Sequence, residues 1–350
     1  MAAREETHRG KAVRNFSPWA SWMLKLAATE PVDPIPTVED LAADPGCLDA
    51  WRSRVRMRLT AMLGSPPEPV PLDVEVSAPT PAEGRSYERS RVVFDSEATM
   101  SVPAELLVPV DRTEPGAAVL AIHGHGPGRS HVCSPQPPEG DPTGNYAHAL
   151  ASRGYVVLAP DLRCFGERAD WNPPDHYACD TNLVHAVMAG ESPLAANLWD
   201  LARALDVLED HPLVDPSRIG AVGLSYGGTC TLFLAALDHR VAAAVVSGYL
   251  SSWAESHKVP WNMCGSQVLP GMLGHLEHLD VAALVAPRPL LVETGRHDDI
   301  FPLDSAIQTV AELRRVYDRL GAGDRLGHDV FDGGHEWHGE VAYSFLDTWL

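Results

Sequence analysis

From residue 117 onward, the chain alternates between short, continuous apolar runs and longer segments with helical periodicity. The apolar runs, of which the last is the weakest, cover residues 117–123, 155–160, 218–224, 241–248, 288–295 and 325–331. Strands that are apolar on both faces and separated by helices form a parallel sheet with helices on each side. The alternation therefore predicts an α/β fold with a mostly parallel central sheet and helices on both faces.

The chain before residue 117 follows a different pattern. Residues 16–64 are predicted to be mainly helical, because Trp51, Val55 and Leu59 recur at helical spacing and Gly64 precedes two prolines. Residues 72–109 alternate as antiparallel strands do. We divide the chain into an N-terminal helical extension, residues 1–65, and an α/β domain, residues 66–350. The extension is expected to be a cap, an oligomer contact or a packed addition to the domain.

Two long excursions, residues 164–200 and 250–285, separate predicted core elements and are rich in Trp, His and Pro. Both follow the carboxyl ends of predicted strands, where ligands bind in open α/β sheets. We expect them to form the walls of a substrate pocket. The side chains predicted to contact substrate are Trp171, His176, Trp253, Trp261, Cys264 and Gln267. For the tryptophans, packing of the excursions onto the body is an equally open alternative.

The sequence Gly223-Leu224-Ser225-Tyr226-Gly227 matches GxSxG and lies between a predicted buried strand and an apolar helical segment. In that context the motif is typical of a nucleophile elbow, in which a sharp turn holds the serine in a strained conformation. Glycines on either side remove the Cβ atoms that would clash there. The alternative is a glycine-rich turn in which the serine is incidental.

A serine hydroxyl needs a base that is oriented by a carboxylate, and in this motif's fold both follow the serine in the chain. Asp298 follows a predicted strand in GRHDDIFP and is the predicted acid, with Asp299 as its alternative. His335, in FDGGHEWHG just before the last predicted helix, is the predicted base. His338 is its competitor, and we expect it to lie within that helix, facing solvent or the pocket rim.

A serine nucleophile also needs two donors for the oxyanion that forms when it attacks. We assign these to the backbone N–H groups of Tyr226, which follows the nucleophile, and His125, in the HGHG turn after the first predicted parallel strand. The spacing of His123 and His125 also raises a metal site as an alternative, which we rank below the oxyanion loop. No metal or cofactor is expected.

A second histidine pair, His275 and His278, could place metal ligands on one helical face. No third ligand is evident in the sequence beside them. We therefore interpret the two histidines as an exposed pair.

The charge balance restricts the class of partner. The chain has 27 basic and 47 acidic residues, which gives a formal net charge of −20. A nucleic-acid binder needs a basic surface to replace phosphate counterions, so nucleic acids and anionic membranes are disfavoured. A neutral small molecule fits this balance better than a polyanion.

The six cysteines show no CxxC spacing. In a chain of 350 residues we expect free thiols rather than a disulfide framework. The N-terminus is polar, and the apolar stretch of residues 16–28 is short and interrupted, so neither a signal peptide nor a membrane span is predicted. The expected location is cytoplasmic.

Taken together, these residues resemble those of the α/β-hydrolase superfamily, and within it the branch of dienelactone-hydrolase-like proteins, acetyl xylan esterases and cephalosporin C deacetylases. The resemblance covers most of residues 38–350. Its landmarks include AIHGHG, APDLRCFGER, GLSYGG, VAPRPLLVETGRHDDIFP and DGGHEW. The resemblance implies the α/β-hydrolase fold and hydrolysis of carboxylic esters through an acyl-enzyme, without a metal or an organic cofactor.

Three classes of function are open at this stage. The leading hypothesis is a serine esterase that acts on a small or medium, neutral ester. The same triad would also serve an acyltransferase, a lactonase or a thioesterase. The third class is a non-catalytic binding protein on a hydrolase scaffold, because a fold does not fix a function.

Overall fold

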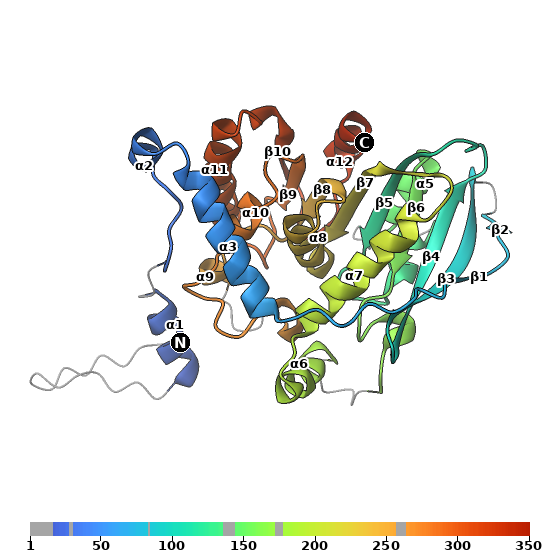
Figure 1. Cartoon of the computed structure of the whole chain (residues 1–350), viewed down its shortest axis with the longest axis horizontal. Coiled ribbons are helices and arrows are strands. Elements are labelled where there is room, and N and C mark those ends of the chain that lie inside the picture. The colour runs from blue at the N-terminus through green and yellow to red at the C-terminus, as the bar shows by residue number, and fades with distance from the viewer. Residues whose placement is uncertain (1–16, 28–30, 83–84, 136–143, 172–177, 257–263) are drawn as a thin grey trace, which may run out of the picture.

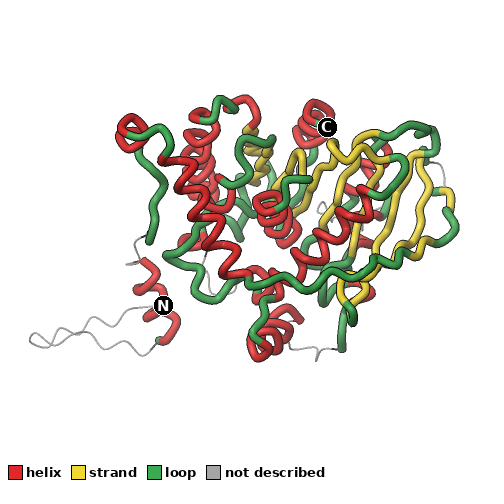
Figure 2. The backbone as a smooth tube through the Cα atoms, in the orientation of Figure 1, coloured by secondary structure: helices red, strands yellow, loops and turns green. Residues whose placement is uncertain are grey.

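A ten-stranded sheet forms the centre of the computed structural model, which describes residues 17–27, 31–82, 85–135, 144–171, 178–256 and 264–350 (Figures 1 and 2). The strands are β1 (Glu75–Val76), β2 (Thr80–Pro81), β3 (Tyr87–Glu97), β4 (Met100–Pro109), β5 (Gly116–Ile122), β6 (Val156–Pro160), β7 (Val214–Leu224), β8 (Val241–Ser247), β9 (Leu290–Gly295) and β10 (Leu326–Phe331). Each apolar run that was predicted to be a strand is one.

The strands are ordered β1-β3-β4-β6-β5-β7-β8-β9-β10, and β2 pairs with β3. Every pairing from β6 to β10 is parallel, whereas β1, β3 and β4 join the sheet through antiparallel pairings. The predicted fold class is therefore confirmed, including the antiparallel strands that precede the parallel sheet.

Helices cover both faces of the sheet. They are α1 (Pro18–Ala27), α2 (Val38–Ala43), α3 (Cys47–Leu63), α4 (Arg129–Cys133), α5 (Tyr146–Ser152), α6 (Ala178–Ala189), α7 (Pro193–Glu209), α8 (Tyr226–Leu237), α9 (Trp253–Ser256), α10 (His278–Ala283), α11 (Leu303–Arg319) and α12 (Glu340–Trp349). Side chains of β5 alternate between two core clusters. One cluster includes α3, α7, α8, α10 and α11, and the other includes α4, α5 and α12.

The chain order creates a topological switch point at the carboxyl ends of β5 and β7. The chain runs from β5 to β6 on one side and then crosses to β7 on the other side of β5. The loops that follow β5 and β7 therefore leave neighbouring strand ends in opposite directions. Ligands of open α/β sheets bind at such a switch point, so the topology locates the functional site here.

Helix α3 is packed into the body of the protein, beside α10 (Figure 1). Trp51, Val55 and Leu59 are fully buried and belong to the same core cluster as α10 and α11. The Arg52 side chain also donates to the carbonyl oxygen of Ala283 in α10, at 3.1 Å. The helix predicted from the spacing of these residues is thus present, and it is integral to the core. Its role as a cap or an oligomer contact stays a prediction.

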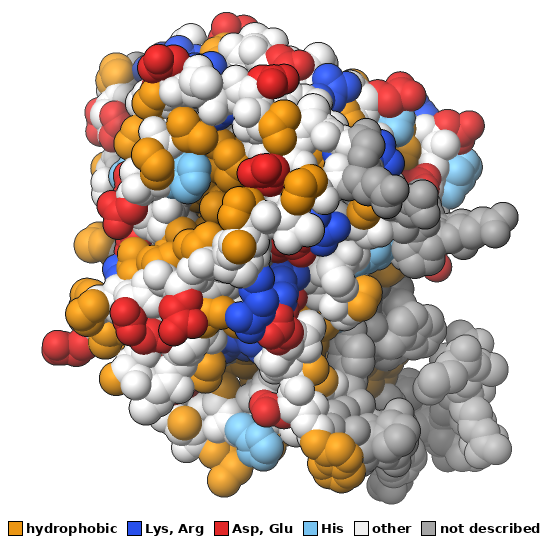
Figure 3. Space-filling model, turned by 90° about the vertical axis from the view of Figure 1, so that its right-hand side faces the viewer, with side chains coloured by type: hydrophobic (Ala, Val, Ile, Leu, Met, Phe, Trp, Pro, Cys, Tyr) orange, Lys and Arg blue, Asp and Glu red, His pale blue; other side chains and the backbone are white. Residues whose placement is uncertain are grey.

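The surface is mixed in character. On the face formed by the antiparallel strands, acidic, basic and hydrophobic side chains are interspersed (Figure 3).

Among the described helices, none combines the length and the apolar composition that crossing a membrane would require.

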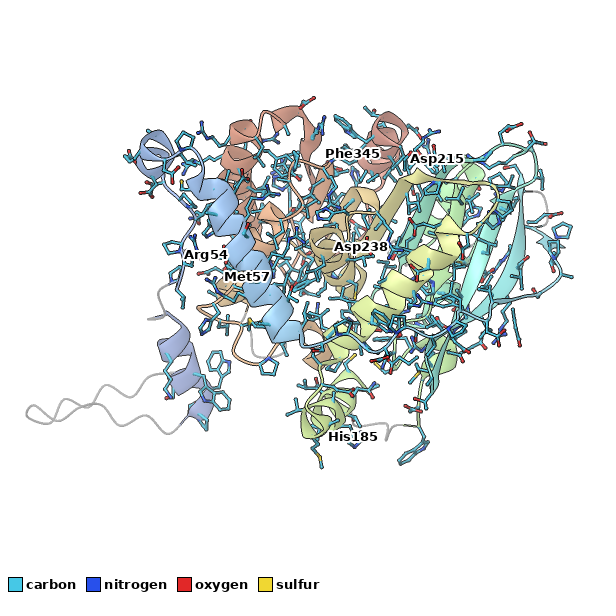
Figure 4. All side chains as sticks on the ribbon, in the orientation of Figure 1. Arg54, Met57, His185, Asp215, Asp238 and Phe345 are labelled. Carbon is cyan, nitrogen blue, oxygen red and sulfur yellow. The ribbon has the colours of Figure 1, made fainter. Side chains whose placement is uncertain are left out.

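Replacement of Trp51 tests whether α3 belongs to the cooperative core. We expect Trp51→Ala to lower the free energy of unfolding by about 3–5 kcal/mol, because the change removes a buried aromatic side chain. Urea unfolding measures the loss. Met57→Ala is the matched control, since Met57 is 65% exposed on the same helix (Figure 4), and it should change stability by less than about 0.5 kcal/mol. Equal, small effects of both changes would contradict the packing argument.

Candidate active site

Ser225 occupies a strained turn between β7 and α8. Its backbone angles are φ 60° and ψ −120°, a conformation that non-glycine residues rarely adopt. A Cβ atom at Gly227 would overlap the carbonyl oxygen of Ile122, and one at Gly223 would overlap the backbone of Gly227. Both glycines are therefore required for the turn. Ser225 is half-buried within an otherwise buried segment, as the predicted elbow requires.

Asp298 and His335 form a hydrogen-bonded pair. His335 Nδ1 lies 2.9 Å from Asp298 Oδ2. The other carboxylate oxygen of Asp298 accepts the backbone N–H groups of Ile300 and Phe301, at 2.8 and 3.0 Å. These bonds fix the carboxylate, which can then hold the Nδ1–H tautomer of the imidazole and leave Nε2 as a proton acceptor. Asp299, the alternative acid, is exposed.

The ends of β7 and β8 bring the serine and the histidine to the same place. The backbone N–H of Ser225 donates to the carbonyl oxygen of Ser247, at 3.0 Å. The next residue, Gly248, has a φ of 54°, and a Cβ atom there would lie 3.1 Å from His335 Cε1. The imidazole therefore lies against Gly248, one residue from the carbonyl that accepts the Ser225 N–H, and a side chain at position 248 would displace it.

The loop after β5 closes the other side of the elbow. A Cβ atom at Gly124 would lie 2.8 Å from the carbonyl oxygen of Leu224 and 3.3 Å from Ser225 Cβ. The loop that carries His125 thus lies against the serine, where the predicted oxyanion donors are needed. That the N–H groups of His125 and Tyr226 serve as those donors stays a prediction.

His123 anchors this loop. Its Nδ1 lies 2.7 Å from the carbonyl oxygen of Gly124, and its Nε2 accepts the backbone N–H of Leu162, at 3.0 Å. Burial lowers the pKa of His123 to about 4, so the ring is neutral near pH 7. Because both ring nitrogens contact the backbone, His123 and His125 do not form the metal pair that their spacing suggested.

The competing histidine, His338, pairs with a different acid. Its Nδ1 is 2.7 Å from Asp329 Oδ2, and its ring stacks on Phe331. The expectation that His338 lies within the last helix is wrong, because α12 begins at Glu340.

The predicted substrate contacts have different environments. Trp253 is fully buried, and its Nε1–H donates to the hydroxyl of Tyr249 at 3.2 Å, which is the packing role left open for it. Gln267 is also buried and donates to the hydroxyl of Thr229 at 3.0 Å. Trp171 is 87% exposed. His176 and Trp261 lie outside the described residues.

Cys264, one of the predicted substrate contacts, lies in a cluster with His125 and Cys179. The sequence analysis did not associate these three residues. His125 Nε2 lies 3.1 Å from the Cys264 sulfur and 3.5 Å from the Cys179 sulfur. Burial, followed by the nearby His335, lowers the pKa of His125 to about 4. The two cysteines are 139 and 54 positions from the histidine, so no local spacing could have revealed the cluster.

The histidines of the second excursion, His275 and His278, are not the exposed pair that the sequence predicted. His275 is exposed, whereas His278 is fully buried and its Nδ1 accepts the backbone N–H of Ser251, at 2.9 Å. The interpretation of both as exposed residues is therefore wrong for His278, whose ring packs between Tyr249 and Trp253.

Comparisons with known proteins agree with this architecture. Residues 142–316 match the dienelactone hydrolase family, a segment that includes Ser225 and Asp298. A protein of Bacillus subtilis (strain 168) described as a hydrolase, YtaP, is 28% identical over 314 residues, which is 85% of this chain and 100% of that protein.

Two solved structures show the same fold. A Bacteroides fragilis protein described as an acetyl xylan esterase aligns with a TM-score of 0.80 at 18% identity, covering 97% of this chain and 96% of that one. A glucuronoyl esterase from Solibacter usitatus aligns with a TM-score of 0.62 at 16% identity, covering 90% and 93%. Both similarities extend over nearly the whole α/β body.

Glu293 is a buried acid in β9 that bonds to the segment between His335 and α12. Its Oε1 accepts the backbone N–H of Gly339, at 2.9 Å. Burial raises the pKa of Glu293 from 4.5 to about 7. The folded protein therefore binds this proton more tightly than the unfolded chain, and stability falls as the pH rises from about 4.5 to about 7.

Replacement of Glu293 by glutamine should remove this pH dependence, because the amide oxygen can still accept the Gly339 N–H. Between about pH 5 and about pH 8, we expect the stability of the wild type relative to Glu293→Gln to fall by on the order of 3 kcal/mol. Urea unfolding of both proteins at the two pH values measures the change. A difference that is independent of pH would contradict the burial argument.

Proposed function

Because this chain belongs to the dienelactone hydrolase family, we propose that Ser225, Asp298 and His335 form a catalytic triad that hydrolyses carboxylic esters. The chain is a serine carboxylic ester hydrolase with the α/β-hydrolase fold. The observation that supports the assignment of residues is the bonded pair of His335 and Asp298. The imidazole of this pair lies against Gly248, next to the residue whose carbonyl accepts the N–H of Ser225 in the strained elbow.

The proposed reaction begins when Ser225 Oγ attacks the ester carbonyl carbon. His335 Nε2 accepts the hydroxyl proton, and the carboxylate of Asp298 stabilises the imidazolium that forms. His335 then donates the proton to the leaving alcohol. Water, activated by the same imidazole, hydrolyses the acyl-serine and regenerates the enzyme.

The negative charge that develops on the carbonyl oxygen needs donors that are already in position. We assign these to the backbone N–H groups of Tyr226 and His125. The first lies at the amino end of α8, where the helix dipole favours negative charge. The second belongs to the loop that the absence of a side chain at Gly124 allows to approach the serine.

We infer that the substrate is a small or medium, neutral ester. A formal net charge of −20 disfavours polyanionic substrates. Two structurally similar proteins are named as an acetyl xylan esterase and a glucuronoyl esterase, so acetylated sugars and sugar-acid esters are the substrates to test first. We also propose a cytoplasmic location, which agrees with six cysteines that are all free.

Removal of the nucleophile tests the mechanism. We expect Ser225→Ala to lower kcat for p-nitrophenyl acetate by on the order of 10⁶-fold, because loss of a triad nucleophile has that effect in other serine hydrolases. Initial rates, together with a circular dichroism spectrum to verify folding, measure the effect. Activity within about tenfold of the wild type would exclude Ser225 as the nucleophile.

The two neighbouring aspartates provide a matched pair of variants. Asp298→Asn should lower kcat by about 10⁴-fold, because an amide no longer holds the imidazole in the reactive tautomer. Asp299→Asn, which changes an exposed neighbour, should leave kcat within about twofold of the wild type. The same p-nitrophenyl acetate assay compares them. Reversed effects would assign the acid to Asp299.

A further inference from the structure

Three side chains of metal-binding type, one histidine and two cysteines, meet at the loop after β5. His125 Nε2, Cys179 Sγ and Cys264 Sγ all lie within 4.8 Å of one another. The sulfur of Cys164 lies 3.8 Å from that of Cys179 but does not lie within 4.8 Å of all three of these atoms. All three cysteines are buried, with at most 8% of their surface exposed.

The distances in this cluster are close to those of a tetrahedral zinc site. Zinc binds thiolate sulfur at about 2.3 Å and imidazole nitrogen at about 2.0–2.1 Å. In a tetrahedron, these bond lengths separate two sulfurs by about 3.8 Å and a sulfur from a nitrogen by about 3.5 Å. His125 Nε2 lies 3.5 Å from the Cys179 sulfur and 3.1 Å from the Cys264 sulfur, and the two sulfurs lie within 4.8 Å of each other. Small side-chain movements therefore bring all three atoms onto one ion.

Hydrogen bonding among thiols explains the arrangement less well. A single nitrogen, His125 Nε2, faces two sulfurs, at 3.1 and 3.5 Å. One ring nitrogen offers either one proton or one lone pair, so it cannot make a strong, directed hydrogen bond to both sulfurs. A cation between the three atoms would satisfy all of them at once.

The cluster lies where α6, the second excursion and the loop after β5 meet, so a metal ion there would link three separate segments. Helix α6 extends at the lower edge of the molecule, where His185 marks it (Figure 4). Cys179 is the one residue of α6 that is buried. The helix is also attached to the second excursion through Asp180, which accepts the backbone N–H of Gly265 at 2.9 Å. The cluster joins Cys179 to Cys264 and to His125, which come from the other excursion and from the oxyanion loop.

We propose that His125, Cys179 and Cys264 bind one zinc ion that holds α6 and the second excursion against the loop after β5. Three protein ligands leave a fourth position, which water fills or which the thiol of Cys164 takes after a side-chain movement. Each thiol loses its proton to solvent when zinc binds. The site is distinct from the proposed triad, and metal content tests it without reference to ester hydrolysis.

The experiment measures zinc in the full-length protein, stripped with a chelator under reducing conditions and then supplied with zinc. We expect one equivalent of zinc to bind. Cys179→Ser and Cys264→Ser should weaken binding by more than the roughly 10–100-fold that loss of an outer-sphere partner costs. Cys47→Ser is the matched control, since Cys47 is the first residue of α3 and belongs to neither group of potential metal ligands among the described residues, and this variant should bind zinc as the wild type does.

Cobalt substitution gives a second measurement that does not depend on the variants. Cobalt in the wild-type protein should show the intense visible bands of tetrahedral coordination and the near-ultraviolet absorption of thiolate-to-cobalt charge transfer. A weak spectrum of octahedral, water-bound cobalt would overturn the proposal. So would zinc binding that Cys179→Ser and Cys264→Ser leave unchanged, or reduced protein that binds no zinc.

Discussion

The close approach of three backbone segments around Ser225 is the constraint on which the site depends. The loop after β5, the elbow after β7 and the turn after β8 meet where side chains are absent, at Gly124, Gly227 and Gly248. A Cβ atom at any of these positions would press on the elbow, on the strand beside it or on the imidazole of His335. The strained φ of Ser225 persists because the neighbouring strands fix the backbone on both sides.

Buried polar groups then determine which side chains can take part in chemistry. The carboxylate of Asp298 is held by two backbone N–H groups and faces His335. His123, in contrast, is neutral and has both ring nitrogens in contact with the backbone. It therefore acts as a support for the oxyanion loop. If zinc also holds His125, the loop is fixed at both of its histidines.

Much of this architecture could be predicted from the sequence, for a physical reason in each case. Strands that are buried on both faces must be continuously apolar, so β5 to β9 were recognisable. The elbow needs glycines at fixed positions, so Ser225 was recognisable by its context. Asp298 and His335 follow from the chain order that the fold imposes.

Other features depend on contacts between distant segments and leave no local pattern. Cys179 and Cys264 approach His125 only after both excursions fold over the sheet. The burial of Trp253 and His278 likewise follows from the way the second excursion packs against Tyr249. The sequence could identify the excursions as pocket walls, but it could not assign each side chain to the pocket or to the core.

The most direct test of the account is to identify the residue that an active-site-directed fluorophosphonate modifies. Folded protein is labelled with one probe, digested and mapped by mass spectrometry. The account predicts a single modified residue, Ser225, because the elbow and the His335–Asp298 pair activate only that hydroxyl. Labelling of a different serine, or folded protein in which Ser225 stays unmodified, would contradict it.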